Sequence, residues 1–380
     1  MKANSYLFKN GVQVQTLGDD SLLAHEAQLV LGFGGKSALS EASVYNSLKT
    51  QFPNAQIALC STAGEIFGAE VLDDSLSVSA MHFDKTSVQT CGINISDFGS
   101  SFDAGAALVK GLPTENLRYV LVLSDGGKVN GSELVRGIES HIKHTIPVTG
   151  GLAGDGANFQ STLVGLNAAP ASGNILAIGF YGDAIRIGHG SMGGWEMFGL
   201  EKTITKSTSN ELFEIDGKNA LELYKQYLGN YANELPGSAL LFPLSIKLSD
   251  DAEPIVRTIL SINNDTNSMI FAGDVPEGAK VRFMKANFDK LIDAASVAAE
   301  NCLHGVDDKN PKLALLISCV GRKIILNRRV EEEVASVREM LGNKVITTGF
   351  YSYGEISPIA ENVRCELHNQ TMTITTFDEK

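Results

Sequence analysis

The fold is decided by Leu313-Ala314-Leu315-Leu316-Ile317, an apolar run that precedes a helical pattern over residues 330–340 and a second apolar run, Val345-Ile346-Thr347. Near-continuous apolar runs separated by one helix are typical of parallel strands that are covered on both faces. The stretch therefore predicts a βαβ unit. A glycine-containing loop, Gly349-Phe350-Tyr351-Ser352-Tyr353-Gly354-Glu355-Ile356, follows its second strand.

Two earlier segments repeat this order of strand, helix, strand and glycine-containing loop. The first leads from Gln28-Leu29-Val30-Leu31-Gly32-Phe33 through a helix over 40–51 to Gln56-Ile57-Ala58-Leu59 and Cys60-Ser61-Thr62-Ala63-Gly64-Glu65-Ile66. The second leads from Tyr119-Val120-Leu121-Val122-Leu123 through a helix over 132–144 to Ile146-Pro147-Val148 and Gly150-Gly151-Leu152-Ala153-Gly154-Asp155. Such units bind ligands beyond the carboxyl ends of their strands, so these loops are candidate ligand sites.

The segment between the second and third units is rich in strand patterns. Residues 163–213 predict mostly strands, and the apolar runs at 175–181 and 183–187 predict a hairpin around Gly182-Asp183. A chain of 380 residues is long for one domain and suits two. We therefore expect an α/β fold with two α/β domains, residues 1–215 and 216–380, built from repeated βαβ units with a β-rich middle segment.

Charge and composition exclude several classes of protein. A net charge of −13 opposes nucleic-acid binding, which depends on neutralising phosphates with Lys and Arg. The longest apolar stretch, near 313–320, is far shorter than the roughly 20 residues that cross a bilayer, so no membrane partner is expected. No signal-peptide pattern follows Met1, which predicts a cytoplasmic protein. Five cysteines without CxxC spacing indicate neither a disulfide framework nor a zinc knuckle.

Glu65 and Glu355 occupy matching positions in two of the three loops. A symmetric pair of carboxylates could face one cleft between domains and would suit an amine-bearing ligand. The alternative stays open that glycine supplies a positive φ and glutamate caps the next helix. The acidic run Glu331-Glu332-Glu333 predicts an ordinary solvated helix face.

Haem is a possible cofactor, and it needs an axial donor in an apolar pocket. His189 is the most suggestive donor, because the small residues of Gly188-His189-Gly190-Ser191-Met192-Gly193-Gly194-Trp195 leave room for a flat ligand that Trp195 could stack on. A turn histidine without a ligand is the alternative. Cys60 and Cys319, at strand ends, could also ligate, although buried free thiols are the default at such positions.

An enzymatic interpretation has little support in the sequence. Ser318-Cys319-Val320-Gly321-Arg322 could present a thiolate beside Arg322, since a neighbouring cation is one route to a reactive cysteine. No histidine neighbours it in sequence. The glycine-rich loops match neither GxxxxGK[ST] nor GxGxxG opening a helix. We therefore expect a binding protein and no catalytic residues.

Six strings, in this order, resemble the N-terminal and C-terminal domains of the FIST family. They are Cys60-Ser61-Thr62-Ala63-Gly64-Glu65-Ile66, Gly150-Gly151-Leu152-Ala153-Gly154-Asp155, Gly193-Gly194-Trp195 with Phe198-Gly199, Glu214-Ile215-Asp216-Gly217 with Ala220-Leu221 and Tyr224, Ser318-Cys319-Val320-Gly321-Arg322, and Gly349-Phe350-Tyr351-Ser352-Tyr353-Gly354-Glu355-Ile356. The resemblance covers nearly the whole chain and implies a bacterial signal-transduction sensor with a small-molecule ligand. The candidate ligand-binding residues are Cys60, Ser61, Thr62, Gly64, Glu65, Gly151, Asp155, Trp195, Cys319, Arg322, Tyr351, Tyr353 and Glu355, and His189 is the candidate metal ligand.

A chain of this size without a fused output domain also resembles the NosP-type haemoproteins of that family. That resemblance implies a haem that senses nitric oxide and a partner histidine kinase that the protein regulates. An amino-acid or other small-metabolite sensor without haem is the alternative, and a cysteine-dependent enzyme is a third.

Overall fold

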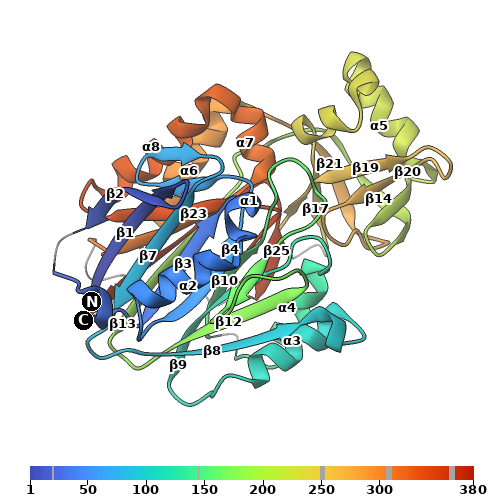
Figure 1. Cartoon of the computed structure of the whole chain (residues 1–380). Helices are drawn as coiled ribbons and strands as arrows, with labels where there is room; N and C mark the ends of the chain where they lie inside the picture. Colours follow the sequence, from blue (N-terminus) through green and yellow to red (C-terminus); the bar gives the residue numbers. More distant parts are fainter. Residues whose placement is uncertain (19–20, 144, 249–252, 305–309, 359–363) are drawn as a thin grey trace.

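Three parallel strand pairs organise the protein in a computed structural model that describes residues 1–18, 21–143, 145–248, 253–304, 310–358 and 364–380 (Figure 1). The pairs are β3 (Leu29–Gly34) with β4 (Gln56–Ser61), β9 (Leu117–Ser124) with β10 (Val148–Leu152), and β22 (Leu313–Cys319) with β23 (Ile346–Ser352). The three predicted βαβ units and the α/β class are therefore confirmed. No helix within the described ranges is both long and apolar enough to cross a membrane.

Each parallel pair lies in a six-stranded mixed sheet. The first sheet runs β11 (Val164–Leu166), β4, β3, β7 (Leu76–His82), β1 (Lys2–Lys9), β2 (Val12–Gly18). The second runs β25 (Cys365–His368), β24 (Gly354–Pro358), β10, β9, β12 (Asn174–Tyr181), β8 (Ser87–Asn94). The third runs β13 (Ile185–Met192), β26 (Met372–Glu379), β22, β23, β5 (Glu65–Phe67), β6 (Glu70–Leu72).

The units exchange strands in a closed cycle. The chain that leaves β4 adds β5 to the third sheet, the chain that leaves β23 adds β24 to the second, and the chain that leaves β10 adds β11 to the first. Three backbone hydrogen bonds mark the crossing points: Ala63 N to Tyr351 O (2.8 Å), Tyr353 N to Leu152 O (3.1 Å), and Gly154 N to Ser61 O (2.9 Å). We call this set the crossing ring.

Alternate residues of the central strands fill two kinds of core. Leu31, Leu121 and Leu315 are fully buried in one cluster that all three sheets share. Their neighbours on the opposite face pack under helices, since strand side chains alternate between the two faces. The covering helices are α1 (Lys36–Leu39) and α2 (Ala42–Gln51) on the first sheet, α3 (Ser101–Lys110) and α4 (Gly131–Glu139) on the second, and α6 (Phe288–Cys302) and α8 (Val330–Leu341) on the third.

Residues 196–285 form a small domain that is inserted between β13 and α6 and stands apart from the three sheets in Figure 1. It has its own apolar core. Its elements are β14 (Glu196–Thr208), β15 (Glu211–Ile215), β16 (Lys218–Asn219), α5 (Ala220–Leu228), β17 (Leu244–Lys247), β18 (Ile255–Arg257), β19 (Ile259–Asn263), β20 (Ser268–Phe271) and β21 (Lys280–Lys285). The boundary at 215/216 stays a prediction, and the second and third sheets contain strands from both sides of it.

Three local predictions were wrong. The hairpin at Gly182 does not form: β12 pairs with β8 and β9 of the second sheet, whereas β13 pairs with β26 of the third. β12 is buried on both faces and takes a partner along each edge, so no edge remains for β13. The helix predicted over 132–144 ends at Glu139, and residue 144 lies outside the described residues. Glu333 is fully buried, although Glu331 and Glu332 are exposed as predicted.

The buried carboxylates of Glu65 and Glu355 accept hydrogen bonds at two of the three crossings. The Oε1 atom of Glu65 accepts a hydrogen bond from Thr62 Oγ1 (2.5 Å), and its Oε2 atom accepts bonds from Ser75 N (2.9 Å) and Ser75 Oγ (2.7 Å). Glu355 repeats the pattern with Ser352 Oγ (2.6 Å), Thr371 N (3.2 Å) and Thr371 Oγ1 (3.0 Å). Each glutamate therefore lies within the first two residues of the exchanged strand and does not cap a helix.

A first prediction concerns Gly349 in β23. Its φ of +150° is one that side chains rarely adopt, and an added Cβ would clash with the carbonyl oxygen of Leu316. We expect Gly349→Ala to lower the free energy of unfolding by about 3 kcal/mol or more, because strain and overpacking add. Urea unfolding measures this. Gly99→Ala is the matched control, since a Cβ there meets nothing within 4 Å. Equal losses in the two variants would contradict the expectation.

A second prediction concerns pH. Burial raises the pKa of Glu65 from 4.5 to about 7 and that of Glu355 to about 8, and hydrogen bonds from their neighbours only partly oppose this. The folded state then holds protons that the unfolded state releases, so this contribution to stability is present at low pH and is lost as the pH rises from 4.5 to about 8.

We expect Glu355→Gln to flatten the fall in the free energy of unfolding between about pH 5 and pH 8, by on the order of 3 kcal/mol. Urea unfolding across that range provides the measurement. Glu115→Gln, at an exposed carboxylate, serves as the control and should follow the wild-type curve. Parallel curves for wild type and Glu355→Gln would refute the assignment.

Candidate functional site

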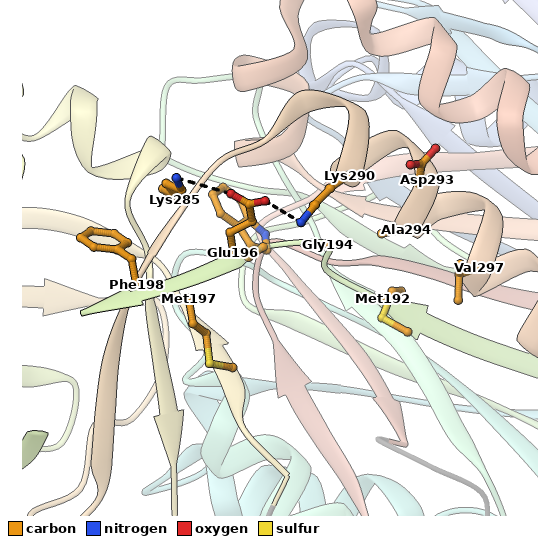
Figure 2. A pocket seen from close by; sticks show the side chains of 11 residues that line it. Met192, Gly194, Glu196, Met197, Phe198, Lys285, Lys290, Asp293, Ala294 and Val297 are labelled. Carbon is orange, nitrogen blue, oxygen red and sulfur yellow. Dashed lines mark ion pairs between the residues drawn. The ribbon is translucent and has the colours of Figure 1, made fainter. Parts of the chain in front are cut away.

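A cavity of about 640 Å³ lies where the small domain joins the core (Figure 2). Its walls come from the end of β13, the start of β14, the end of β21 and one face of α6. The lining residues are Met192, Gly194, Trp195, Glu196, Met197, Phe198, Lys285, Lys290, Asp293, Ala294 and Val297. We call it the hinge cavity, because both chain connections between core and small domain, 192–196 and 285–288, run along it.

Part of the hinge cavity's lining is apolar and exposed. Met192, Met197 and Val297 keep 37%, 42% and 39% of their surface exposed. Trp195 is held by a hydrogen bond from its Nε1 to the carbonyl oxygen of Gln370 (2.9 Å), which fixes one edge of the indole ring. Flexible methionines beside a fixed aromatic ring suit small apolar ligands of varied shape.

The hinge cavity also carries charges of both signs. Glu196 pairs with Lys290 (2.6 Å) and Lys285 (3.6 Å), as Figure 2 shows. The hydrogen bond from Lys290 is the main reason that the pKa of Glu196 lies below its ordinary value. Asp293 is one helical turn beyond Lys290 on α6 and makes no ion pair with any described residue. The cavity therefore offers an ammonium and a carboxylate on one helix face.

Of the predicted ligand-binding residues, Trp195 lines this cavity. Most of the others lie inside the core, buried and distant in sequence from the cavity walls. These are Cys60, Ser61, Thr62, Gly64, Glu65, Gly151, Cys319, Arg322, Tyr351 and Glu355. Glu65 and Glu355 face their own hydroxyl and amide partners instead of a shared cleft. A role for these residues in ligand binding stays a prediction.

Arg322 forms hydrogen bonds with two chain segments that carry residues of the cavity lining. Its Nε pairs with Glu333 Oε1 (2.5 Å), and its other nitrogens donate to the carbonyl oxygens of Leu291 (2.7 Å) and Gly193 (2.5 Å). The guanidinium thus joins α6 to the segment that carries Trp195. Glu333 also accepts a hydrogen bond from Tyr351 (3.0 Å). A neutralised and fully buried Arg322 is a positioning residue for the walls of the cavity.

The cysteine candidates have the environment of buried thiols. Burial raises the pKa of both Cys60 and Cys319 above its ordinary value, and the charge of Glu355 adds to the effect on Cys319. The thiols therefore stay protonated at neutral pH. Arg322 cannot offset this, because its charge is already matched by Glu333. This environment does not favour a nucleophilic thiolate.

The small residues around His189 have a structural reason. An added Cβ at Gly188 or Gly190 would clash with carbonyl oxygens of α6, those of Cys302 and Ala298, so the glycines let the helix approach β13 closely. They leave no room for a flat ligand. His189 points to the other face of β13 from Met192, because the two positions differ by an odd number of residues. His189 is therefore not part of the hinge cavity.

Haem does not fit these residues well. The hinge cavity has an apolar wall of suitable character, but its lining contains no histidine or cysteine. Within the described residues, no cluster of three or more His, Cys, Asp or Glu side chains could hold a metal ion.

Asp155 and Tyr353 lie together at a second place. The hydroxyl of Tyr353 donates a hydrogen bond to Asp155 Oδ1, and Asp155 Oδ2 lies 3.9 Å from the ammonium of Lys36. Tyr353 also lines a separate cleft between the second sheet and the small domain. Trp195 and Tyr353 are thus the predicted residues that line these two cavities. The charged residues of the hinge cavity were missed, because Glu196 and Lys285 meet only through long-range strand pairing.

Comparisons with known proteins agree with the resemblance seen in the sequence. A model of the FIST N domain matches residues 28–218, and a model of the FIST C domain matches residues 220–358. An uncharacterised protein of Methanocaldococcus jannaschii is 23% identical over 209 residues, or 50% of this chain, and the match spans only 39% of that relative's length.

A crystal structure of cyanuric acid hydrolase from A. caulinodans can be superposed over 100% of this chain and 99% of its own, with 6% identity and a TM-score of 0.39. A likeness at that TM-score carries no argument. The two family models together span most of the chain, from β3 to β24. The chain therefore belongs to the FIST family, whose domains are small-ligand-sensing domains of signalling proteins.

Proposed function

We propose that the protein senses a small metabolite that binds in the hinge cavity, and that it acts by binding and not by catalysis. The observation that carries the proposal is the position of the cavity on both chain connections between core and small domain. A ligand there contacts β14 of the small domain and α6 of the core. It can therefore favour one relative orientation of the two bodies, which is the differential affinity that a sensor requires.

The lining favours a zwitterion with an apolar side chain, such as an apolar amino acid. Lys290 can take a carboxylate, since its side chain is 57% exposed and its ammonium has further donors beyond its bond to Glu196. Asp293 can take an amine. The apolar part would lie against Trp195 and the two methionines. This supports the metabolite-sensor form of the prediction.

Haem-based nitric-oxide sensing with a histidine kinase as partner is the more specific alternative to a metabolite sensor. The cavity supports it less, because its lining provides no imidazole or thiolate. A signalling protein that recognises the small domain in one of its orientations is the partner that the hinge mechanism calls for. A net charge of −13 argues against nucleic acid in that role.

Trp195 is the single tryptophan of the chain, so its fluorescence reports on the hinge cavity. We expect at least one apolar L-amino acid to change that fluorescence saturably, with Lys290→Gln and Asp293→Asn each weakening the affinity about tenfold or more. Lys110→Gln, at an exposed lysine of α3, is the control and should bind as wild type does. No saturable change with any amino acid, or equal affinity in Lys290→Gln, would exclude this ligand class.

A haem titration separates the two alternatives. We expect no Soret band that saturates at one haem per chain, because the cavity lacks a strong axial donor. The test uses absorption spectra of the full chain and of His189→Ala. A stoichiometric Soret band would contradict this expectation and support the haem sensor, and its loss in His189→Ala would identify His189 as the axial ligand at a site outside the hinge cavity.

A further inference from the structure

We propose that a second cleft, separate from the hinge cavity, binds a small planar ring that carries an acidic group. The cleft has a volume of about 340 Å³. Its core side includes Lys128, Phe159 and Tyr353, and its small-domain side includes Asn210 and Leu260. We call it the interdomain cleft.

The interdomain cleft lies where α/β sheets bind ligands. Gly126 and Gly127 follow β9, and Leu152 is the last residue of β10, so the cleft opens beyond the carboxyl ends of a parallel pair. Both backbone amides of the glycine turn are already bonded, to Thr162 and Asp125. Recognition therefore depends on side chains.

Phe159 presents an unusual aromatic surface to the cleft. The residue is 47% exposed, and its ring stacks on Tyr353, with centroids 4.5 Å apart and an interplanar angle of 18°. Its φ of +53° is a left-handed conformation that a bulky residue rarely adopts, at a cost of roughly 1–3 kcal/mol. A strained and exposed phenylalanine is better explained by a ligand that covers it than by folding stability alone.

A hydrogen-bond network holds this ring in place. Phe159 N donates to Tyr353 Oη (3.0 Å), and the same hydroxyl donates to Asp155. Asp155 Oδ2 accepts from Gln160 N (3.1 Å) and Ser161 N (2.9 Å). Burial raises the pKa of Tyr353, so its hydroxyl keeps the proton that this network needs. Asp155 is thus a positioning residue for a preorganised aromatic platform.

Only one of the three units builds such a platform. In the first and third units, a glutamate stands two positions after the residue that donates the crossing-ring bond. These glutamates are Glu65 and Glu355, and the exchanged strand of each unit includes its glutamate. The second unit has Gly156 at that position, and its chain forms a loop until β11 begins at Val164. The loop that carries Phe159 is therefore the departure from the threefold repeat.

Lys128 supplies the charge. It is exposed on the core side of the cleft, and its ammonium makes no ion pair or hydrogen bond with the residues that the structure describes. Its backbone amide donates to Asp125 (2.7 Å), which fixes the position of the lysine. Leu260, 44% exposed, adds an apolar surface from the small domain. An aromatic platform, one free cation and one apolar contact suit a planar aromatic acid.

The test is isothermal titration of the full chain with benzoate and nicotinate, and with their uncharged amides benzamide and nicotinamide. We expect at least one acid to bind, its amide to bind about tenfold more weakly or worse, and Lys128→Gln to reduce acid affinity about tenfold or more. Phe159→Gly should lose binding while unfolding at an equal or higher urea concentration, because glycine relieves the strain at this φ.

Trp195→Ala distinguishes this site from the hinge cavity, since it should leave benzoate or nicotinate affinity unchanged. Three outcomes would overturn the proposal: no binding of either acid up to about 10 mM, equal binding of acid and amide, or undiminished acid binding in Lys128→Gln. Loss of acid binding in Trp195→Ala would assign the ligand to the hinge cavity and also overturn the second site.

Discussion

The crossing ring is the constraint on which the rest of the structure depends. The bonds from Ala63 to Tyr351, from Tyr353 to Leu152 and from Gly154 to Ser61 lie where each unit passes a segment to the next sheet. Because the exchange is cyclic, no unit can complete its sheet or cover the shared core alone. The fold of each unit therefore depends on the two others, and the core is expected to unfold cooperatively.

The sequence predicted the parts of this fold that are encoded locally. Apolar runs and helix periodicity are local, and the three parallel pairs formed as predicted. The cyclic exchange joins segments such as β5 and β23, which are far apart in sequence, and no local pattern specifies their pairing. The hairpin error at Gly182 has the same origin, because a turn signal shows where a chain reverses but not which sheet the next strand enters.

The burial of Glu333 could have been predicted from the helix periodicity, but the acidic run around it favoured an exposed position. Glu333 stands in an acidic run, yet it falls on the same face of α8 as Val330, Val334 and Val337, whose spacing is that of a buried helix stripe. Its partner Arg322 comes from the preceding helix and completes a buried pair. For the candidate site, the resemblance to the FIST family indicated Trp195 and Tyr353. The positions of the lysines in the two cavities could not be predicted from the sequence. Contacts between segments that are far apart in the chain decide whether each lysine has an ion-pair partner.

The small domain is attached to the core in two different ways. At the hinge cavity the attachment is covalent, through the two chain connections. Beside the interdomain cleft it is polar: Asp274 accepts hydrogen bonds from Arg136 (2.8 Å) and Asn130 (3.3 Å) of the core. The buried guanidinium of Arg257 in the small domain also donates a hydrogen bond to the carbonyl oxygen of Leu367 in the core (2.8 Å). A ligand at either proposed site would contact both the small domain and the cyclic core.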